Sequence, residues 1–189
     1  MNEIKQSLAE AQQMLDLFSS DEKKLKAIED AGNLMVDCIK NNHKIISCGN
    51  GGSMSDAMHF AEELTGLFRE MRPAIAALSI SDPSHITCAA NDFGFENIFS
   101  RYVESIGQPG DILLAISTSG NSKNVLNAAL TARNKQMKIV ALTGKDGGEL
   151  AHHCDVEIRA PFSKYSDRTQ EIHIKIIHCL IQFIESHLA

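Results

Sequence analysis

The sequence predicts an α/β protein with a doubly wound, parallel sheet of five strands. Five short apolar runs alternate with helical stretches over residues 44–160, and strands that alternate with helices form parallel sheets covered on both faces. The apolar spacing on either side of this region is helical, which adds an N-terminal helical hairpin and a long C-terminal helix. We expect one domain over residues 1–189, because a chain of this length buries a single substantial core.

The N-terminal hairpin is predicted over residues 1–42, with the α/β sandwich and terminal helix over 43–189. Spacings of four and three define the seam of a first helix that packs on a partner helix, formed by Ile4, Leu8, Ala11, Leu15 and Phe18. The segment Ser19–Glu22 has the pattern of a capping box and opens a second helix. That helix ends near Asn41 and Asn42.

The strands of the sheet are expected at residues 44–48, 75–80, 112–116, 138–142 and 156–160. A terminal helix follows at about 167–188. Apolar residues cover much of its circumference: Ile172, Ile176, Ile177, Leu180, Ile181 and Ile184. A helix that is apolar on more than one side favours an oligomer assembled through the terminal helices, and the alternative is central packing within one chain.

Composition excludes several classes of protein. A net charge of −6 without a basic run argues against a nucleic-acid-binding face. The five cysteines are scattered and lie mostly in apolar runs, which is typical of reduced thiols. The N-terminus lacks the apolar core of a signal peptide, and no apolar stretch approaches 18 residues. We therefore expect a cytoplasmic protein that binds neither nucleic acid nor membrane.

A loop rich in hydroxyls, Ser117–Ser122, follows the predicted strand 112–116 and precedes a helix. Unpaired N–H groups at a helix N-terminus attract anions, and small hydroxyls add donors. Three or four charge-assisted hydrogen bonds of about 1.5–3 kcal/mol each can hold a phosphate without a lysine. The alternative is a plain polar turn with Ser122 as the helix N-cap.

A second glycine-rich loop, Cys48–Ser53, follows the predicted strand 44–48. Ligands of doubly wound sheets bind at the carboxyl ends of the strands. Neither loop matches a dinucleotide fingerprint or a P-loop, so NAD and ATP are poor candidates. The pattern favours a small phosphorylated ligand.

Candidate acid–base residues lie on two predicted helices. His59 and Glu63 are four residues apart and share a helix face, where they can chelate a metal or pair an acid with a base; an exposed surface pair is the alternative. The terminal helix carries Gln170, His173 and His178. Gln170 and His178 share a face but lie about 12 Å apart along the axis, so their spacing permits joint ligation without favouring it. A histidine in an apolar helix is otherwise an ordinary core residue.

Several motifs together resemble one family. They are SCGNGGS at 47–53, DAMHFAEELTG at 56–66, NDFG at 91–94, STSGNS at 117–122, LTGKDGG at 142–148, and QEIH at 170–173 with His178. Taken alone, Asn91 and Asp92 read as part of a turn. In this order, over nearly the whole chain, the motifs resemble the phosphoheptose isomerases of the SIS, or sugar isomerase, superfamily.

The resemblance implies a flavodoxin-like or Rossmann-like three-layer sandwich, a cytoplasmic homotetramer, and one zinc ion per subunit. It also implies an aldose–ketose isomerase that converts sedoheptulose 7-phosphate into D-glycero-D-manno-heptose 7-phosphate. This is the first step toward the activated heptose of lipopolysaccharide or capsule. The sugar phosphate is then the small-molecule partner.

Site residues are carried over from the family by motif. Glu63 and His178 are the implied acid–base pair. The implied zinc ligands are His59, Glu63, Gln170 and His178. The implied phosphate cradle is Ser117, Thr118, Ser119 and Ser122. The rest of the sugar would contact Asn50, Gly51, Gly52, Asn91 and Asp92, with Glu63 and Gln170 also touching substrate.

The implied roles agree with the chemistry. Moving a carbonyl between C1 and C2 needs a base, an acid and stabilisation of an enediolate, and a carboxylate with an imidazole suffices. A tightly bound metal ligand cannot shuttle a proton at the same time, so zinc is either loosely held or the roles alternate. One departure from the family pattern is Leu67, where a basic residue is expected.

The alternative function is a non-catalytic SIS module that binds sugar phosphate or a replication-initiator protein. Such modules are altered at the positions of Glu63 and His178, whereas both residues are present in this chain. The isomerase is therefore favoured.

Overall fold

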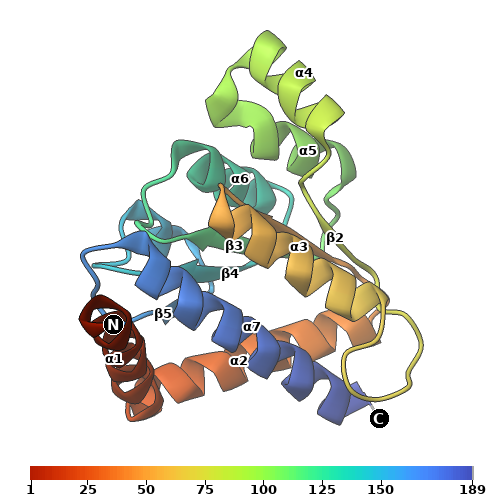
Figure 1. Cartoon of the computed structure of the whole chain (residues 1–189). Helices are drawn as coiled ribbons and strands as arrows, with labels where there is room; N and C mark the ends of the chain where they lie inside the picture. The colour runs from red at the N-terminus through yellow and green to blue at the C-terminus, as the bar shows by residue number, and fades with distance from the viewer. Residues whose placement is uncertain (189) are drawn as a thin grey trace.

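The computed structural model describes residues 1–188 and confirms the doubly wound parallel sheet (Figure 1). Its strand order is β2-β1-β3-β4-β5, and every neighbouring pair is parallel. The strands are β1 (Ile45–Gly49), β2 (Ala77–Ser79), β3 (Ile112–Ser117), β4 (Lys138–Thr143) and β5 (Val156–Arg159). Each lies within two residues of its predicted limits. Because β1 pairs with β2 on one side and with β3 on the other, the loops that follow β1 and β3 meet at the topological switch point.

Helices cover both faces of this sheet. One face carries α1 (Asn2–Ser19), α2 (Glu22–Lys40), α3 (Gly52–Thr65) and α7 (Ser166–Leu188). The other carries α4 (Pro83–Phe93), α5 (Ile98–Ile106) and α6 (Lys123–Asn134). Two short 3-10 turns, η1 (Phe95–Asn97) and η2 (Glu149–His153), complete the described chain. The N-terminal hairpin therefore lies on the same face as α7 (Figure 1).

Strand alternation divides the core in two. Ile112, Leu114 and Ile116 of β3 point into the core beneath α2, α3 and α7. Leu113 and Ala115 point into the core beneath α5 and α6. Successive side chains of a strand face opposite sides, so a fully apolar run is what a strand buried on both faces requires.

One sequence prediction is wrong in detail, and another stays open. Helix α1 continues through Ser19, and the N-cap of α2 is Asp21, whose carboxylate accepts a hydrogen bond from the Lys23 N–H. The pattern over Ser19–Glu22 is therefore no capping box centred on Ser19. The six apolar side chains that suggested an oligomer through α7 are buried within the chain, by α1, α2, α3 and the sheet, whereas Ile174, Phe183 and Leu188 stay partly exposed. Packing within one chain therefore accounts for these six side chains, and assembly of an oligomer through the terminal helices stays a prediction.

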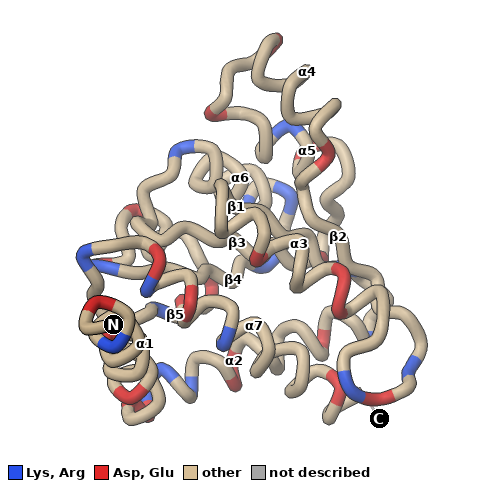
Figure 2. Tube along the Cα trace, viewed as in Figure 1, with Lys and Arg blue, Asp and Glu red and all other residues tan. Residues whose placement is uncertain are grey.

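Several exposed apolar residues lie on the N-terminal hairpin. Ile4, Leu8 and Leu17 of α1 are at least half exposed, and Leu25 of α2 is 38% exposed. Elsewhere, short basic and acidic segments are interleaved along the trace (Figure 2). No helix within residues 1–188 is long and apolar enough to cross a bilayer.

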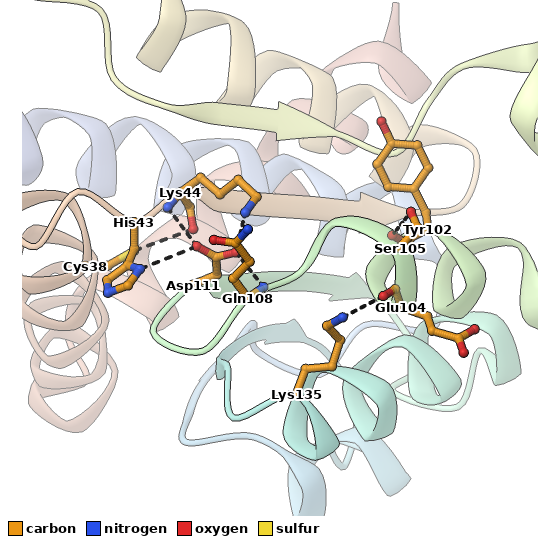
Figure 3. Close-up of polar contacts among 9 residues, drawn as sticks. All are labelled: Cys38, His43, Lys44, Tyr102, Glu104, Ser105, Gln108, Asp111 and Lys135. Atoms are coloured by element: carbon orange, nitrogen blue, oxygen red, sulfur yellow. Dashed lines mark hydrogen bonds and ion pairs between the residues drawn. The ribbon is translucent and has the colours of Figure 1, made fainter.

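The amino end of the sheet is held by a buried carboxylate, Asp111, drawn in Figure 3. Its side chain is 1% exposed and accepts hydrogen bonds from the Lys44 N–H (3.0 Å), the Lys44 Nζ (2.5 Å) and the Gln108 N–H (2.9 Å). The His43 Nδ1 lies 3.8 Å away. One carboxylate thus joins the start of β3 to the segment that leads into β1.

Replacing this carboxylate should destabilise the fold. We expect Asp111→Asn to lower the free energy of unfolding by about 2–4 kcal/mol, because removing one member of a buried pair leaves the other charge uncompensated. Denaturant titration measures the loss. Asp155→Asn is the control, since Asp155 makes similar contacts with Lys138 and the Ile139 N–H while 28% of its side chain is exposed. Equal losses in the two variants would contradict the prediction.

Candidate active site

The first glycine loop joins β1 to α3 through a backbone that favours glycine. Gly51 has φ +56° and is the N-cap of α3, without a side chain to cap the helix. The side chain of Asn50 exchanges two hydrogen bonds with Asn124 of α6 (2.8 and 2.9 Å). This amide pair ties the loop to the first turn of α6, so the N-termini of α3 and α6 meet at one edge of the sheet.

The hydroxyl loop lies between β3 and α6, as predicted. Ser122 occupies the N-cap position of α6, yet its side chain makes no capping hydrogen bond in the described structure. Its hydroxyl accepts a hydrogen bond from the Ser117 hydroxyl (3.0 Å) instead. The Val125 N–H donates to the Asn124 side chain (3.0 Å), which leaves the N–H groups of Lys123 and Asn124 in the first turn of α6 available to an anion. This favours the phosphate cradle over the plain polar turn.

The loop after β4 supports the hydroxyl loop from behind. Gly120 has φ +66°, and a Cβ placed there would lie 1.8 Å from the carbonyl oxygen of Gly147. The Leu150 N–H donates to the Gly120 carbonyl (2.9 Å), and the Glu149 N–H donates to the Asn121 side chain (3.1 Å). The segment 147–150 after β4 thus packs on the hydroxyl loop and hydrogen-bonds to it.

Three of the predicted acid–base and metal residues meet in space. The Nε2 of His59 lies 3.3 Å from a Glu63 carboxylate oxygen on α3 and 3.2 Å from the Nε2 of His178 on α7. Phe68 packs beside His178, with ring centroids 5.7 Å apart. Burial lowers the pKa of His178, the neighbouring His59 adds to this effect, and Glu63 opposes it. His178 is therefore kept neutral at neutral pH and can accept a proton.

Gln170 lies at the far end of the α3–α7 contact. A Cβ on Gly52 would come 2.6 Å from the Gln170 side-chain oxygen, so this amide packs directly on the first turn of α3. The structure thus brings Gln170 to the first glycine loop, about two helical turns from His178. Its predicted contact with substrate fits this location better than does a place beside His59.

The donor atoms at His59 suit zinc. Zinc binds neutral imidazole nitrogens and carboxylate oxygens, and two ligand atoms about 2.0–2.1 Å from a tetrahedral ion lie about 3.3 Å apart. The two imidazole nitrogens and the Glu63 oxygen have about this spacing around His59. Glu62 brings a second carboxylate within 4.8 Å of the donor atoms of His59 and Glu63, but its side chain is exposed. His59 and Glu63 therefore suit a zinc ion, and the His178 nitrogen beside His59 is a candidate third ligand.

Asn91 and Asp92 lie away from this cluster. They form the last turn of α4 before its C-cap, Gly94, so their interpretation as part of a turn is wrong. Both are exposed; the Asn91 amide donates to the Asp92 carboxylate (2.8 Å), and Asp92 also lies 3.5 Å from the Cys88 Sγ. Helix α4 lies on the opposite face of the sheet from α7 (Figure 1). Their contact with substrate stays a prediction.

Two buried titratable groups flank the site. Burial raises the pKa of Asp56 on α3 to about 6, and one of its carboxylate oxygens has no hydrogen-bond partner in the described structure. Burial lowers the pKa of His173 on α7 to about 4. The Nε2 of His173 lies 2.8 Å from the Thr143 carbonyl oxygen, where a neutral ring donates. His173 is therefore the ordinary core histidine that the sequence left as an alternative.

These two groups should give opposite pH dependences of stability. The pKa of histidine is about 6.5 in the unfolded chain, whereas burial lowers that of His173 to about 4 in the folded chain. His173 therefore destabilises the fold as pH falls through this range, by about 3 kcal/mol in total. Asp56 stays protonated in the fold up to about pH 6, so it destabilises the fold as pH rises from about 4 to 6. We expect the two effects to offset each other partly.

Denaturant titrations from pH 4 to 7.5 test this. The stability of His173→Gln relative to wild type should rise as pH falls, and that of Asp56→Asn should rise as pH increases. Differences that are flat with pH would contradict the assignment. At pH 7.5 we expect Asp56→Asn to be more stable by about 1–2 kcal/mol, a value reduced for the partial hydration of the carboxylate.

Sequence reasoning missed Asn124, which completes the first loop. Its side chain is 2% exposed and bonds Asn50 across 74 residues of sequence. The one available signal was an asparagine in the first turn of a helix whose N-cap was already assigned to Ser122. It also missed Asp56, although a carboxylate on the face adjoining His59 is visible in the sequence.

Comparison with known proteins gives a consistent result. The family model of the SIS domain matches residues 8–144. The phosphoheptose isomerase of Glaesserella parasuis serovar 5 is 60% identical over 182 residues, covering 96% of this chain and 95% of that protein. The phosphoheptose isomerase of Histophilus somni is 58% identical, covering 100% of this chain and 97% of that protein.

Solved structures of phosphoheptose isomerases have the same fold as this chain. A phosphoheptose isomerase from Neisseria gonorrhoeae has a TM-score of 0.91 at 38% identity and covers 98% of both chains. One from Francisella tularensis has a TM-score of 0.93 at 36% identity, covering 98% of this chain and 97% of that one. The similarity therefore extends over the whole fold, including both loops and α7.

Proposed function

The chain belongs to the phosphoheptose isomerases of the SIS domain family, and we propose that Glu63 and His178 form the acid–base pair of its reaction. It is an aldose–ketose isomerase that converts sedoheptulose 7-phosphate into D-glycero-D-manno-heptose 7-phosphate, in heptose biosynthesis. One observation carries the proposed pair. The His59–His178 contact joins α3 to α7 across 119 residues and brings His178 to the helix that bears Glu63.

The proposed mechanism moves two protons. Starting from the ketose, the Glu63 carboxylate removes a proton from C1, and the electron pair forms the enediolate. Neutral His178 then transfers a proton from the C1 hydroxyl to the C2 oxygen, and Glu63 returns its own proton to C2. Both groups end in their initial states. The hydroxyl loop holds the phosphate at the opposite end of the sugar, so that C1 and C2 reach the pair.

Zinc is proposed as the cofactor. His59, Glu63 and His178 would hold it, and Gln170 remains the predicted fourth ligand, although it packs on Gly52 in this structure. A zinc ion bound there would polarise the carbonyl and favour the enediolate. Because a ligand must be deprotonated, Glu63 and His178 can transfer protons only while they are not tightly coordinated.

The proposal retains the cytoplasmic homotetramer that the resemblance implies. The exposed apolar residues Ile4, Leu8 and Leu17 on α1 support an interface through the N-terminal hairpin. A second subunit could also bring Asn91 and Asp92 of its α4 to this site. A complementation assay with two differently inactivated subunits tests that arrangement: recovered activity supports a shared site.

The alternative, a non-catalytic SIS module, is not favoured. Such a module needs the phosphate cradle but has no use for a carboxylate and a neutral imidazole that converge from two helices. The test is to incubate the purified protein with sedoheptulose 7-phosphate and follow the anomeric signals by NMR. New aldose signals are expected. A protein that binds the sugar phosphate without converting it would instead be the non-catalytic module.

Metal content tests the zinc proposal separately. We expect protein purified without chelator to hold about one zinc per chain and His59→Ala to lose most of it, because the shared central ligand is removed. Elemental analysis measures both. His152→Ala is the control, since His152 is exposed in η2 and should leave the zinc content unchanged. Equal zinc in His59→Ala and wild type would remove His59 from the ligand set.

A further inference from the structure

The carboxyl end of α3 is capped by an arginine from the loop that follows it. The last carbonyls of a helix lack partners within the helix. The Arg72 Nη2 donates to the Glu63 carbonyl oxygen (2.7 Å), and its Nη1 donates to the Leu64 carbonyl oxygen (2.8 Å). The side chain is 10% exposed. A positive group at a helix C-terminus also complements the helix dipole.

The same guanidinium binds α7. Its Nε donates to a Glu185 carboxylate oxygen (2.9 Å), and the Glu185 side chain is 6% exposed. Glu185 follows His178 by seven residues, which is about two turns and returns to the same helix face. One planar group therefore connects the backbone of Glu63 to the helix face that carries His178.

The ion pair borders open space as well as the apolar contact between α3 and α7. A cavity of about 490 Å³ adjoins the ion pair and is lined by Arg72 and Glu185 themselves, with Met71, Pro73 and Ile75 from the same loop. Met71 is 89% exposed. With space on one side and solvent on the other, the loop has room to shift if Arg72 loses its acceptors. At the opposite end of the contact, Gln170 packs on Gly52.

We infer that Arg72 is a positioning residue for the isomerase reaction. Paired with Glu185, it fixes the end of α3 against α7 and so sets how Glu63 faces His178. The inference rests on the proposed roles of Glu63 and His178. A displacement of about 1 Å in a catalytic group can cost about 100-fold in rate, so a clamp remote from substrate affects kcat more than KM.

Steady-state kinetics of the full chain test the inference. We expect Arg72→Met and Glu185→Met each to lower kcat by about 10- to 100-fold while KM changes by less than about threefold. Glu185→Gln should stay within about threefold of wild type in kcat, because the amide oxygen still accepts from the Arg72 Nε. When Glu63→Gln is already present, adding Arg72→Met should not lower kcat further, because both substitutions act through the Glu63 carboxylate.

Phe99→Leu is the stability control, since Phe99 is fully buried on the opposite face of the sheet. If Arg72→Met lowers kcat no more than Phe99→Leu, the role is merely structural and the inference fails. If Arg72→Met does not fold, the comparison of Glu185→Met with Glu185→Gln decides: equal kcat values would overturn the inference. An inactive wild-type protein would count against the proposed function. This inference alone would be overturned if wild type is active, Glu63→Gln is inactive and Arg72→Met keeps the wild-type kcat.

Discussion

Glu63→Gln is expected to lower kcat by about 100- to 10,000-fold, the range that a general acid–base group contributes. The amide is nearly isosteric with the carboxylate but cannot accept a carbon-bound proton. Because the hydroxyl loop is proposed to anchor the substrate at its phosphate, we expect KM to change little. NMR in deuterated water provides a second measurement: exchange of the substrate C1 proton with solvent should fall together with turnover.

Glu62→Gln is the matched control for this prediction. Glu62 is the preceding residue on α3, its carboxylate lies within 4.8 Å of the donor atoms of His59 and Glu63, and its side chain is exposed. We expect its kcat to remain within about threefold of wild type. If Glu62→Gln loses as much activity as Glu63→Gln, the loss is explained by the change in charge near His59 and not by the loss of the carboxylate that abstracts the proton.

The sheet and its helices could be predicted because their signals are local. Runs such as Ile112–Ile116 are apolar at every position, which only a strand buried on both faces requires. The extent of burial of α7 is not local. Its apolar circumference is explained by α1, α2 and α3 packing around it within one chain, and the sequence cannot distinguish these neighbours from those of a second subunit.

At the site, too, local contacts could be predicted from the sequence and contacts between distant segments could not. Helical spacing places His59 and Glu63 on one face, and their contact is observed. The contact of His178 with His59 depends on how α7 crosses α3, so it came from the family resemblance and not from spacing. Arg72 gave no sequence signal, because its acceptors are the backbone carbonyls of another segment. Charged residues in a loop are otherwise typical of a solvated surface.

Gly120→Ala should have the second large effect, through the shape of the phosphate cradle. A Cβ at Gly120 would lie 1.8 Å from the Gly147 carbonyl oxygen and 2.4 Å from its carbon. Both atoms are backbone, so no side chain can rotate away, and the positive φ adds strain for any residue with a Cβ. We expect the free energy of unfolding to fall by about 2–4 kcal/mol.

The same variant should lower kcat/KM by at least about 100-fold, mostly through KM, because the displaced loop carries the hydroxyls that are proposed to bind phosphate. Gly51→Ala separates the two causes of instability. Gly51 has φ +56°, but a Cβ there has no neighbour within 4 Å, so it should lose only the backbone preference of about 1–2 kcal/mol. If the two variants lose equal stability, the clash with Gly147 is not what requires glycine at position 120, and the loop after β4 does not support the cradle.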